Sequence, residues 1–389
     1  MSIDPQTLTA NWSYPTSIRF GPGRIRELPE VCRELAIARP LFVTDPGLVA
    51  MPMTQEAIES LGSDAAVFSD VQANPIGANV DDGVRRYKEG GHDGVIAFGG
   101  GSALDVGKAI ALMSGQRRPL WDFEDIGDNF RRADVDGIAR TIAIPTTAGT
   151  GSEVGRASVI TEEATHTKRI IFHPKMLPAV AIDDPALTLG LPPFLTAATG
   201  MDALAHCFEA YCGTAFHPLA DGVGAEGVRL VKEWLPVAVA DGSNLEARAN
   251  MLAAGSMGAT AFQKALGAIH ALSHPLGALY NLHHGQLNAV VMPYVMAFNR
   301  EAIELKMERL AAYIGLTDRS FDGMMAWILD LRTSIGIPHT LGELGVETAR
   351  IPELARMGAI DPSAAGNPIP IGESEIARML ENAISGEPI

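Results

Sequence analysis

A long stretch without charged residues, from 265 to 299, constrains this chain more than any other feature of its sequence. Hydropathy alone would make such a run a candidate membrane span. Two prolines, several amide side chains and four histidines inside it argue against a helix that faces lipid. We therefore interpret the run as the buried interior of a soluble protein, where each histidine needs a polar partner. A bound metal ion would supply such partners.

Four side chains are candidate metal ligands. Asp202 and His206 are four residues apart, so a helix would place both on one face. His270 and His284 come from the charge-free run. One carboxylate and three imidazoles suit a divalent transition metal, Fe or Zn, with a position left open for a substrate oxygen. The alternative is that these residues are hydrogen-bonded members of the core, because such pairs also occur by chance on helices.

The overall composition limits the class of protein. A chain of 389 residues is long enough for two domains. Its net charge of −16 disfavours nucleic acids and anionic membranes as partners. The three cysteines have no CxxC spacing, so we expect neither a disulfide framework nor a zinc ribbon. Residues 1–15 lack the basic and apolar regions of a signal peptide, and we expect a cytoplasmic protein.

Secondary-structure patterns differ between the two halves. The first half alternates short β-rich runs with helical stretches, which predicts a parallel sheet covered by helices. The second half is rich in Ala, Leu and Met with helical spacing. We place the boundary within residues 185–193, which gives an α/β domain of residues 1–186 and an all-α domain of residues 187–389. The expected strands span residues 41–45, 65–69, 94–98, 141–145 and 179–183, and expected helices span residues 53–61, 81–90 and 103–114.

A glycine-rich loop, residues 99–102, follows the expected strand 94–98. Glycines let the backbone approach a pyrophosphate closely, and the N-terminus of the next helix offers free N–H groups. The alternative is a well-capped helix start, because Ser102 and Asp105 fit a capping box. Leu104 replaces the third glycine of the dinucleotide fingerprint, so the match is incomplete.

A second loop of small residues, 146–153, follows the expected strand 141–145. Its hydroxyls and N–H groups suit a phosphate or a ribose, whereas the alternative is a flexible turn. Two such loops at the carboxyl edge of one sheet are stronger evidence for a nucleotide site than either alone. Asp45 ends another expected strand, where it would bind a ribose diol and disfavour NADP. Alternatively, Asp45 only stabilises the turn at Pro46.

Taken together and in this order, these motifs resemble the iron-containing (group III) alcohol dehydrogenase family. The resemblance implies a Rossmann-like dinucleotide-binding α/β domain, an all-α metal-binding domain with the architecture of dehydroquinate synthase, and an active-site cleft between them. The matching segments cover most of the chain: GGGSxxDxxK from Gly99, PTTAGTGSE from Pro145, GMDxxxH from Gly200 and HxxxHPxGAxYNxxHG from His270.

The resemblance implies a homodimer with one Fe²⁺, or Zn²⁺, in each chain. Carried over by position, the metal ligands would be Asp202, His206, His270 and His284. The segment from Lys168 to Pro174 is similar to the family's lysine-bearing strand, so Lys168 is one of the implied NAD contacts. These contacts are Asp45, Asn74, Gly100, Gly101, Ser102, Asp105, Thr146, Thr147, Thr150 and Lys168.

The activity implied by the resemblance is reversible hydride transfer between NAD(H) and a small alcohol or aldehyde, with the metal as a Lewis acid. His274, one turn beyond His270, is our candidate for passing the proton out of the site. It is an equally good candidate for a residue that stabilises the turn at Pro275. Two functions of other classes stay open: a dehydroquinate synthase-like lyase that uses NAD transiently, and a metallohydrolase without a nucleotide.

Two cations depart from the family pattern. Arg156 stands where several family members have an apolar residue, and Lys264 stands where asparagine is common. Two cations near the metal would hold a carboxylate at the far end of a short substrate. This interpretation favours an ω-hydroxy acid or semialdehyde, such as 4-hydroxybutyrate and succinate semialdehyde. The alternative is that both side chains face water.

Overall fold

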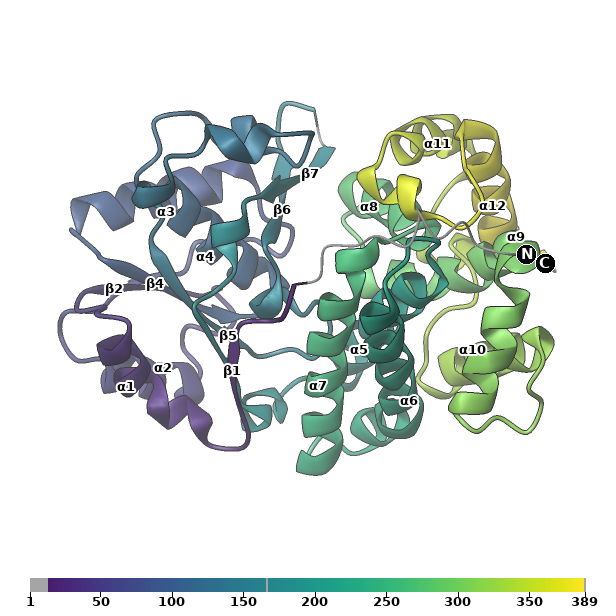
Figure 1. The fold of residues 1–389 in the computed structure, drawn as a ribbon, viewed down its shortest axis with the longest axis horizontal. Helices are drawn as coiled ribbons and strands as arrows, with labels where there is room; N and C mark the ends of the chain where they lie inside the picture. The colour runs from purple at the N-terminus through teal and green to yellow at the C-terminus, as the bar shows by residue number, and fades with distance from the viewer. Residues whose placement is uncertain (1–12, 166, 388–389) are drawn as a thin grey trace. The chain divides into compact units, whose positions relative to one another are not determined.

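The computed structural model describes residues 13–165 and 167–387, so most of the N-terminal stretch that bears on a signal peptide lies outside the described residues. The described chain divides into two compact units (Figure 1). One unit holds residues 15–190. The other holds residues 191–387 together with Ser13 and Tyr14.

A parallel sheet of six strands forms the centre of the unit of residues 15–190, in the order β1-β8-β5-β4-β2-β3. The five predicted strands are confirmed, with ends that differ by up to two residues. β1 is not among the predicted strands, because its sequence SIRF is short and half polar. The strands are β1 (Ser17–Phe20), β2 (Pro40–Val43), β3 (Ala66–Phe68), β4 (Gly94–Gly99), β5 (Arg140–Pro145) and β8 (Val180–Asp183).

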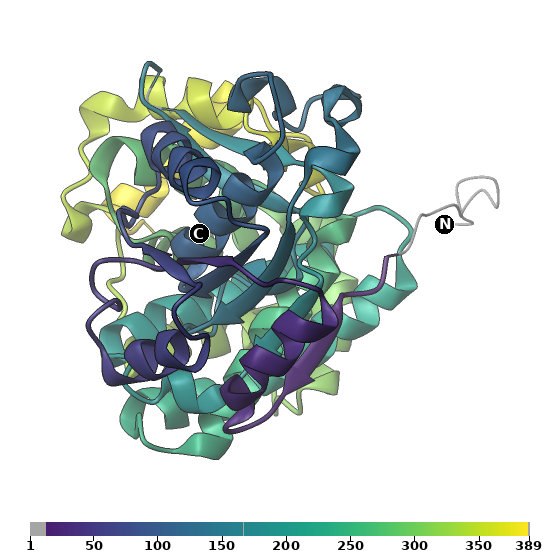
Figure 2. The same ribbon diagram turned by 90° about the vertical axis from the view of Figure 1, so that its left-hand side faces the viewer.

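Helices cover both faces of this sheet, as Figure 2 shows from the side of the sheet unit. Leu41 and Val43 point to the face that packs on α3 and α4, whereas Phe42 points to the face that packs on α1 and α2. Successive side chains of a strand alternate between faces, so a strand buried on both faces is apolar throughout. The predicted helices correspond to three of the four covering helices, which are α1 (Leu28–Glu34), α2 (Pro52–Ser60), α3 (Gly77–Glu89) and α4 (Gly101–Met113).

A separate antiparallel pair of strands, β6 (Ala157–Glu162) and β7 (Thr167–Phe172), belongs to the same unit. β7 begins one residue before Lys168, as the resemblance implies. β6 is not among the predicted strands. Its sequence ASVITE is short, does not alternate strictly between polar and apolar residues, and begins only four residues after the small-residue loop.

The other unit is helical, as predicted from its Ala-, Leu- and Met-rich sequence. Its central helix, α5, packs against α6, α7 and α9 and is buried along most of its length. A helix that is apolar on every side is buried in this way. The helices are α5 (Pro193–Cys212), α6 (Pro218–Ala240), α7 (Leu245–Ala261), α8 (Ala268–Tyr280), α9 (His284–Tyr313), α10 (Phe321–Ser334), α11 (Ile351–Ala359) and α12 (Glu373–Ser385).

The charge-free run of residues 265–299 forms α8 and the first half of α9. Most of its residues are buried within the helical unit, which agrees with its interpretation as protein interior. In the chain as far as the structure describes it, we find no helix with the length and apolar character to cross a membrane.

Gly285 allows the start of α9 to lie directly against α5. A Cβ atom at this position would lie 2.1 Å from the carbonyl oxygen of Ala198 and 3.1 Å from the Cβ of Asp202. Any larger residue would push α9 away from α5. The glycine therefore allows His284, the first residue of α9, to lie close to Asp202 of α5.

Candidate metal centre

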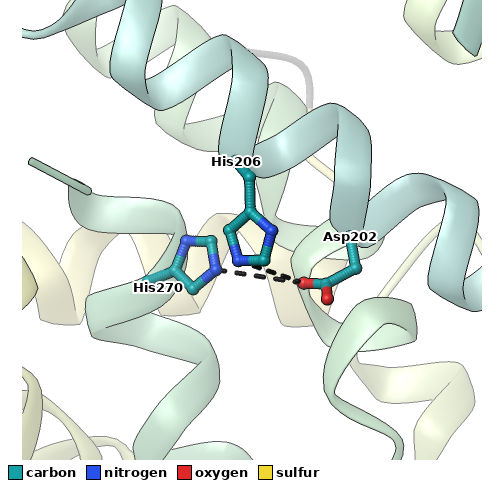
Figure 3. A group of neighbouring side chains, drawn as sticks. All are labelled: Asp202, His206 and His270. Carbon is teal, nitrogen blue, oxygen red and sulfur yellow. Dashed lines mark ion pairs between the residues drawn. The ribbon is translucent and has the colours of Figure 1, made fainter. Parts of the chain in front are cut away.

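Three helices bring the four predicted ligands together. Asp202 and His206 project from one face of α5, His270 projects from α8, and His284 is the first residue of α9. Figure 3 shows the carboxylate of Asp202 directed at the rings of His206 and His270. Because the spacing of four residues on α5 is local, the sequence predicts that pair directly.

The ligand atoms surround a small volume. The Nε2 atoms of His206, His270 and His284 lie 3.8, 3.9 and 3.6 Å from the Oδ1 atom of Asp202. Ligand atoms of Asp202, His206 and His270 all lie within 4.8 Å of one another. These three residues are buried, whereas the side chain of His284 is 26% exposed. The centre therefore opens to its surroundings on the side of His284.

Asn288 shows that these lone pairs converge. Its amide Nδ2 donates to Oδ1 of Asp202 at 2.8 Å and lies 3.3 Å from Nε2 of His270 and 3.2 Å from Nε2 of His284. Its Oδ1 atom is buried and makes no hydrogen bond within the described chain. Acceptors that gather around one positively polarised donor would gather equally around a cation. The donor set of one carboxylate oxygen and three imidazole nitrogens thus fits a divalent transition metal.

A buried carboxylate lies behind His270. Oε2 of Glu209 is 2.5 Å from Nδ1 of His270, and Oε1 of Glu209 accepts a hydrogen bond from the N–H of Ile269 at 2.6 Å. Burial lowers the pKa of His270, but the charge and hydrogen bond of Glu209, with the charge of Asp202, outweigh it and raise this pKa overall. Glu209 is not among the predicted site residues. Its position seven residues after Asp202, on the same helix face, is the pattern that would have indicated it.

His274 makes a similar contact one turn further along α8. Its Nδ1 lies 2.8 Å from Oδ2 of Asp361, and its ring stacks on that of His284 with centroids 5.3 Å apart. Burial raises the pKa of Asp361, but the charge and hydrogen bond of His274 outweigh burial and lower it overall. The other oxygen of Asp361 caps the next 3₁₀ turn through the N–H of Ser363. His274 therefore lies beside the candidate ligands with a fixed ring orientation.

The two small-residue loops of the other unit lie side by side, as predicted. They follow β4 and β5, which are adjacent parallel strands. The N–H of Thr146 donates to the carbonyl oxygen of Gly99 at 3.0 Å, and a Cβ at Gly101 would lie 2.6 Å from Cγ2 of Thr150. Thr147 likewise lies beside Gly100. Residues from both loops therefore line one edge of the sheet, where α/β folds bind nucleotides.

Asp105 connects α4, the helix that follows the first loop, to the second loop and to β6. Its Oδ1 accepts from Ser152 Oγ at 2.6 Å and lies 3.2 Å from Lys108 Nζ, and its Oδ2 accepts from the N–H of Val159 at 2.8 Å. Ser102 lies within α4 and donates to the carbonyl oxygen of Ala73. The capping-box alternative is therefore wrong, because the N-cap residue of α4 is a glycine with no side chain to accept a bond.

The remaining predicted NAD contacts come from other elements of the same unit. Asp45 follows β2, and its Oδ1 accepts from the N–H groups of Gly47 and Leu48 at 2.8 and 3.0 Å. Its Oδ2 faces the first loop, 3.4 Å from where a Cβ of Gly99 would stand. Asp45 thus stabilises the turn, as the alternative holds, while its second oxygen stays beside the glycines. Asn74 directly follows Ala73, whose carbonyl oxygen accepts from Ser102. Lys168 lies on β7.

The two unusual cations belong to different units. Lys264 is buried, with Nζ 2.5 Å from Oδ1 of Asp221, so its charge is already paired inside the helical unit. Arg156 belongs to the other unit, where its guanidinium lies over the ring of Phe172 at 5.8 Å. The expectation that Lys264 is available to a substrate carboxylate is therefore wrong. Its ion pair joins residues that are distant in sequence, which no local pattern indicates.

Comparison with known proteins identifies the family. Residues 15–185 match the family description "Iron-containing alcohol dehydrogenase", and residues 196–384 match "Fe-containing alcohol dehydrogenase family, C-terminal". The chain is 39% identical over 380 residues to the 4-hydroxybutyrate dehydrogenase of Cupriavidus necator, with 95% of this chain and 99% of the relative covered. It is 38% identical over 376 residues to the 1,3-propanediol dehydrogenase of Citrobacter freundii, with 94% of this chain and 96% of the relative covered.

Solved structures agree with this assignment. A 1,3-propanediol oxidoreductase superposes with a TM-score of 0.91 at 35% identity, over 96% of this chain and 100% of that one. The sulfoacetaldehyde reductase of Bifidobacterium kashiwanohense, solved with NAD⁺, superposes with a TM-score of 0.88 at 32% identity, over 97% and 100%. The chain therefore belongs to the iron-containing alcohol dehydrogenase family and is a metal-dependent NAD(H) alcohol dehydrogenase.

Proposed function

We propose that Asp202, His206, His270 and His284 hold one divalent ion in this dehydrogenase. The observation that carries the proposal is the convergence of their ligand atoms on a single volume, where three of the four residues also surround the amide of Asn288. Fe²⁺ is the ion we expect from the family, and Zn²⁺ suits the same donors. When bound, such an ion acts as a Lewis acid toward the alcohol or aldehyde oxygen of the substrate.

Metal content tests this ligand set. His270→Ala and His284→Ala should each lose bound metal, because an open transition-metal site depends on all its ligands. His283→Ala is a matched control, since this neighbouring histidine is not in the set and should leave metal content unchanged. Full metal occupancy in both ligand variants, measured by elemental analysis after dialysis, would show that the assignment is wrong.

The same proposal assigns NAD(H) to residues 1–186 and the metal to residues 187–389. The adjacent loops after β4 and β5 support the NAD(H) site. Within it, Asp105 acts by holding the loops in place, since both its carboxylate oxygens already accept hydrogen bonds from the protein. The residues that we propose to form the NAD(H) site, Asp105 by holding the loops and the others by contact, are Asp45, Asn74, Gly100, Gly101, Ser102, Asp105, Thr146, Thr147, Thr150 and Lys168.

His274 is the residue that we propose takes the alcohol proton. Its Nδ1 is held by Asp361, so in the neutral form of the ring the proton lies on Nδ1 and Nε2 is an acceptor. General acid–base groups of this kind contribute about 10²–10⁴-fold to rate. His274→Asn should therefore lower kcat in this range while metal content stays at the wild-type level. An unchanged kcat would leave His274 with a purely structural role.

The substrate that we propose is a short alcohol or aldehyde with an anionic group at its far end. The names of two relatives, a 4-hydroxybutyrate dehydrogenase and a sulfoacetaldehyde reductase, support an anionic substrate. Arg156 is the cation we assign to that group, because a guanidinium binds a carboxylate through two parallel hydrogen bonds. Lys264 is no longer part of the proposal, since Asp221 already neutralises it.

A comparison of two aldehydes tests the substrate. Succinate semialdehyde and butyraldehyde have the same chain length and differ in the terminal carboxylate. We expect kcat/KM to favour succinate semialdehyde and this preference to shrink in Arg156→Ala. Arg85→Ala, an exposed arginine on α3, is the matched control and should leave the ratio unchanged. Equal use of both aldehydes by the wild-type enzyme would contradict the proposal.

A cytoplasmic homodimer completes the proposal. Family membership supports both, and the net charge of −16 gives no attraction to nucleic acid or anionic membrane. Light scattering of the purified protein would measure the oligomeric state directly. A monomeric mass at micromolar concentration would contradict the dimer.

A further inference from the structure

Glu209 is a buried carboxylate that the activity does not require as a ligand. It lies on α5, one helical turn beyond His206, and only 6% of its surface is exposed. Its two oxygens contact two neighbouring residues of another helix, the N–H of Ile269 and Nδ1 of His270. An ionised side chain is costly to bury unless each of its oxygens is satisfied, and here both are.

The contact requires a side chain with two acceptors. The N–H of Ile269 is one of the first N–H groups of α8, which have no acceptor within the helix. It therefore needs an acceptor from another part of the chain, and Glu209 supplies one. If the second oxygen of Glu209 also acts as an acceptor, Nδ1 of His270 must carry the proton. The neutral ring of His270 then presents Nε2 as a lone pair, and this atom lies 3.9 Å from Oδ1 of Asp202.

The backbone before α8 is shaped to admit this carboxylate. A Cβ atom on Gly267 would lie 3.0 Å from Oε1 of Glu209. Asn367 satisfies the preceding N–H of the same helix, that of Ala268, at 3.2 Å. The start of α8 is therefore fixed by two side chains from elsewhere in the unit, and only Glu209 also reaches a candidate ligand.

We propose that Glu209 is a positioning residue that fixes the tautomer and orientation of His270 and thereby sets the affinity of the enzyme for its divalent metal. This inference rests on the ligand set proposed above. Carboxylates behind metal-binding histidines make the imidazole a better ligand, and their loss commonly weakens metal binding by about 10–100-fold. Glu209 also adds a negative charge next to His270, which favours a dication over a neutral occupant.

Glu209→Gln is the most informative variant because it keeps the size of the side chain but has one acceptor oxygen instead of two. If that oxygen accepts from Ile269, the amide NH₂ group faces Nδ1 of His270 and favours the tautomer with a proton on Nε2. If the oxygen instead accepts from His270, the amide NH₂ group and the N–H of Ile269 oppose each other. Either arrangement weakens the metal ligand or its support.

The measurement is the dissociation constant for Zn²⁺, obtained by competition with a chromogenic chelator on the full-length protein. We expect a Kd about 10–100-fold higher in E209Q than in the wild type. The ligand-field spectrum of the Co²⁺-loaded protein should change as well, because it reports the histidines that coordinate the ion. Asp361→Asn is the matched control: it alters the same type of contact at His274 and should leave the Zn²⁺ affinity within about twofold.

His270→Ala separates the possible failures. If H270A loses Zn²⁺ affinity and E209Q keeps the wild-type value, Glu209 only caps α8 and the inference is wrong. If H270A itself keeps wild-type affinity, the ligand set is wrong and the inference falls with it. Should E209Q fail to fold, Glu209→Asp decides, since it keeps two acceptors but withdraws them by one methylene. Weakened Zn²⁺ binding in a folded E209D supports the inference, and wild-type binding overturns it.

Discussion

His270 and His274 lie one turn apart on α8, and each directs its Nδ1 atom at a buried carboxylate from a different part of the chain. Glu209 of α5 holds the first histidine at 2.5 Å, and Asp361, which follows α11, holds the second at 2.8 Å. The two rings therefore have fixed orientations beside the candidate metal centre. One serves as a proposed ligand and the other as a proposed proton acceptor, although both make the same kind of contact.

Asp45 should set the preference for NAD over NADP. Asp45→Asn keeps an oxygen to accept from the N–H groups of Gly47 and Leu48, so the turn survives while the charge is lost. A carboxylate near a 2′-phosphate costs ~1 kcal/mol in well-screened surroundings, which corresponds to about a fivefold change in binding. We expect the ratio of kcat/KM for NAD to that for NADP to fall by this factor. A wild-type preference for NADP would show that Asp45 does not face the 2′ position.

Lys264 should contribute to stability and not to substrate selection. Its side chain is 1% exposed, and its partner Asp221 is 36% exposed. Lys264→Met leaves the carboxylate of Asp221 partly buried and without its cation, at a cost of about 1–3 kcal/mol in the free energy of unfolding. Activities with succinate semialdehyde and butyraldehyde should change by equal factors. A selective loss with succinate semialdehyde would return Lys264 to the substrate site.

Asp105 should be important for the stability of the unit that contains the sheet. Lys108 is fully buried, burial lowers its pKa, and the charge of Asp105 is the largest influence that opposes this shift. Asp105→Ala leaves this lysine without that partner, which costs about 3–5 kcal/mol when a buried pair is broken. Urea unfolding of the single variants and of D105A/K108M measures the effect. We expect the double variant to be less destabilised than the sum of the two, since the unpaired charge is gone.

Asp361 should make stability depend on pH in the acidic range. Its pKa is lowered in the folded protein, whereas an unfolded aspartate titrates near pH 3.9. The ionised carboxylate therefore stabilises the fold above about pH 4, and this contribution is lost as the pH falls through the lowered value. The difference in unfolding free energy between wild type and Asp361→Asn should shrink as the pH falls below about pH 4. A difference that grows on acidification below about pH 4 would contradict the lowered pKa.

Local periodicity in the sequence predicts a large part of this fold and half of the ligand set. Five strands followed from apolar runs, because a strand buried on both faces is apolar at every position. Asp202 and His206 followed from helical spacing, and the neighbouring loops after β4 and β5 followed from the rule that ligands bind at the carboxyl edge of a parallel sheet. A residue's position relative to its own strand or helix is fixed by backbone geometry alone.

Contacts between side chains that are distant in sequence follow from the packing of the helices and not from any local pattern. Asp361 reaches a histidine 87 residues earlier, Glu209 reaches one 61 residues later, and Lys264 pairs with an aspartate 43 residues before it. The sequence predicts each of these residues equally well as an exposed charge. Helix packing, with Gly285 and Gly267 each allowing a close approach, determines which of them are buried together. Once buried, a charged group must find a partner, and that requirement gives these residues their contacts.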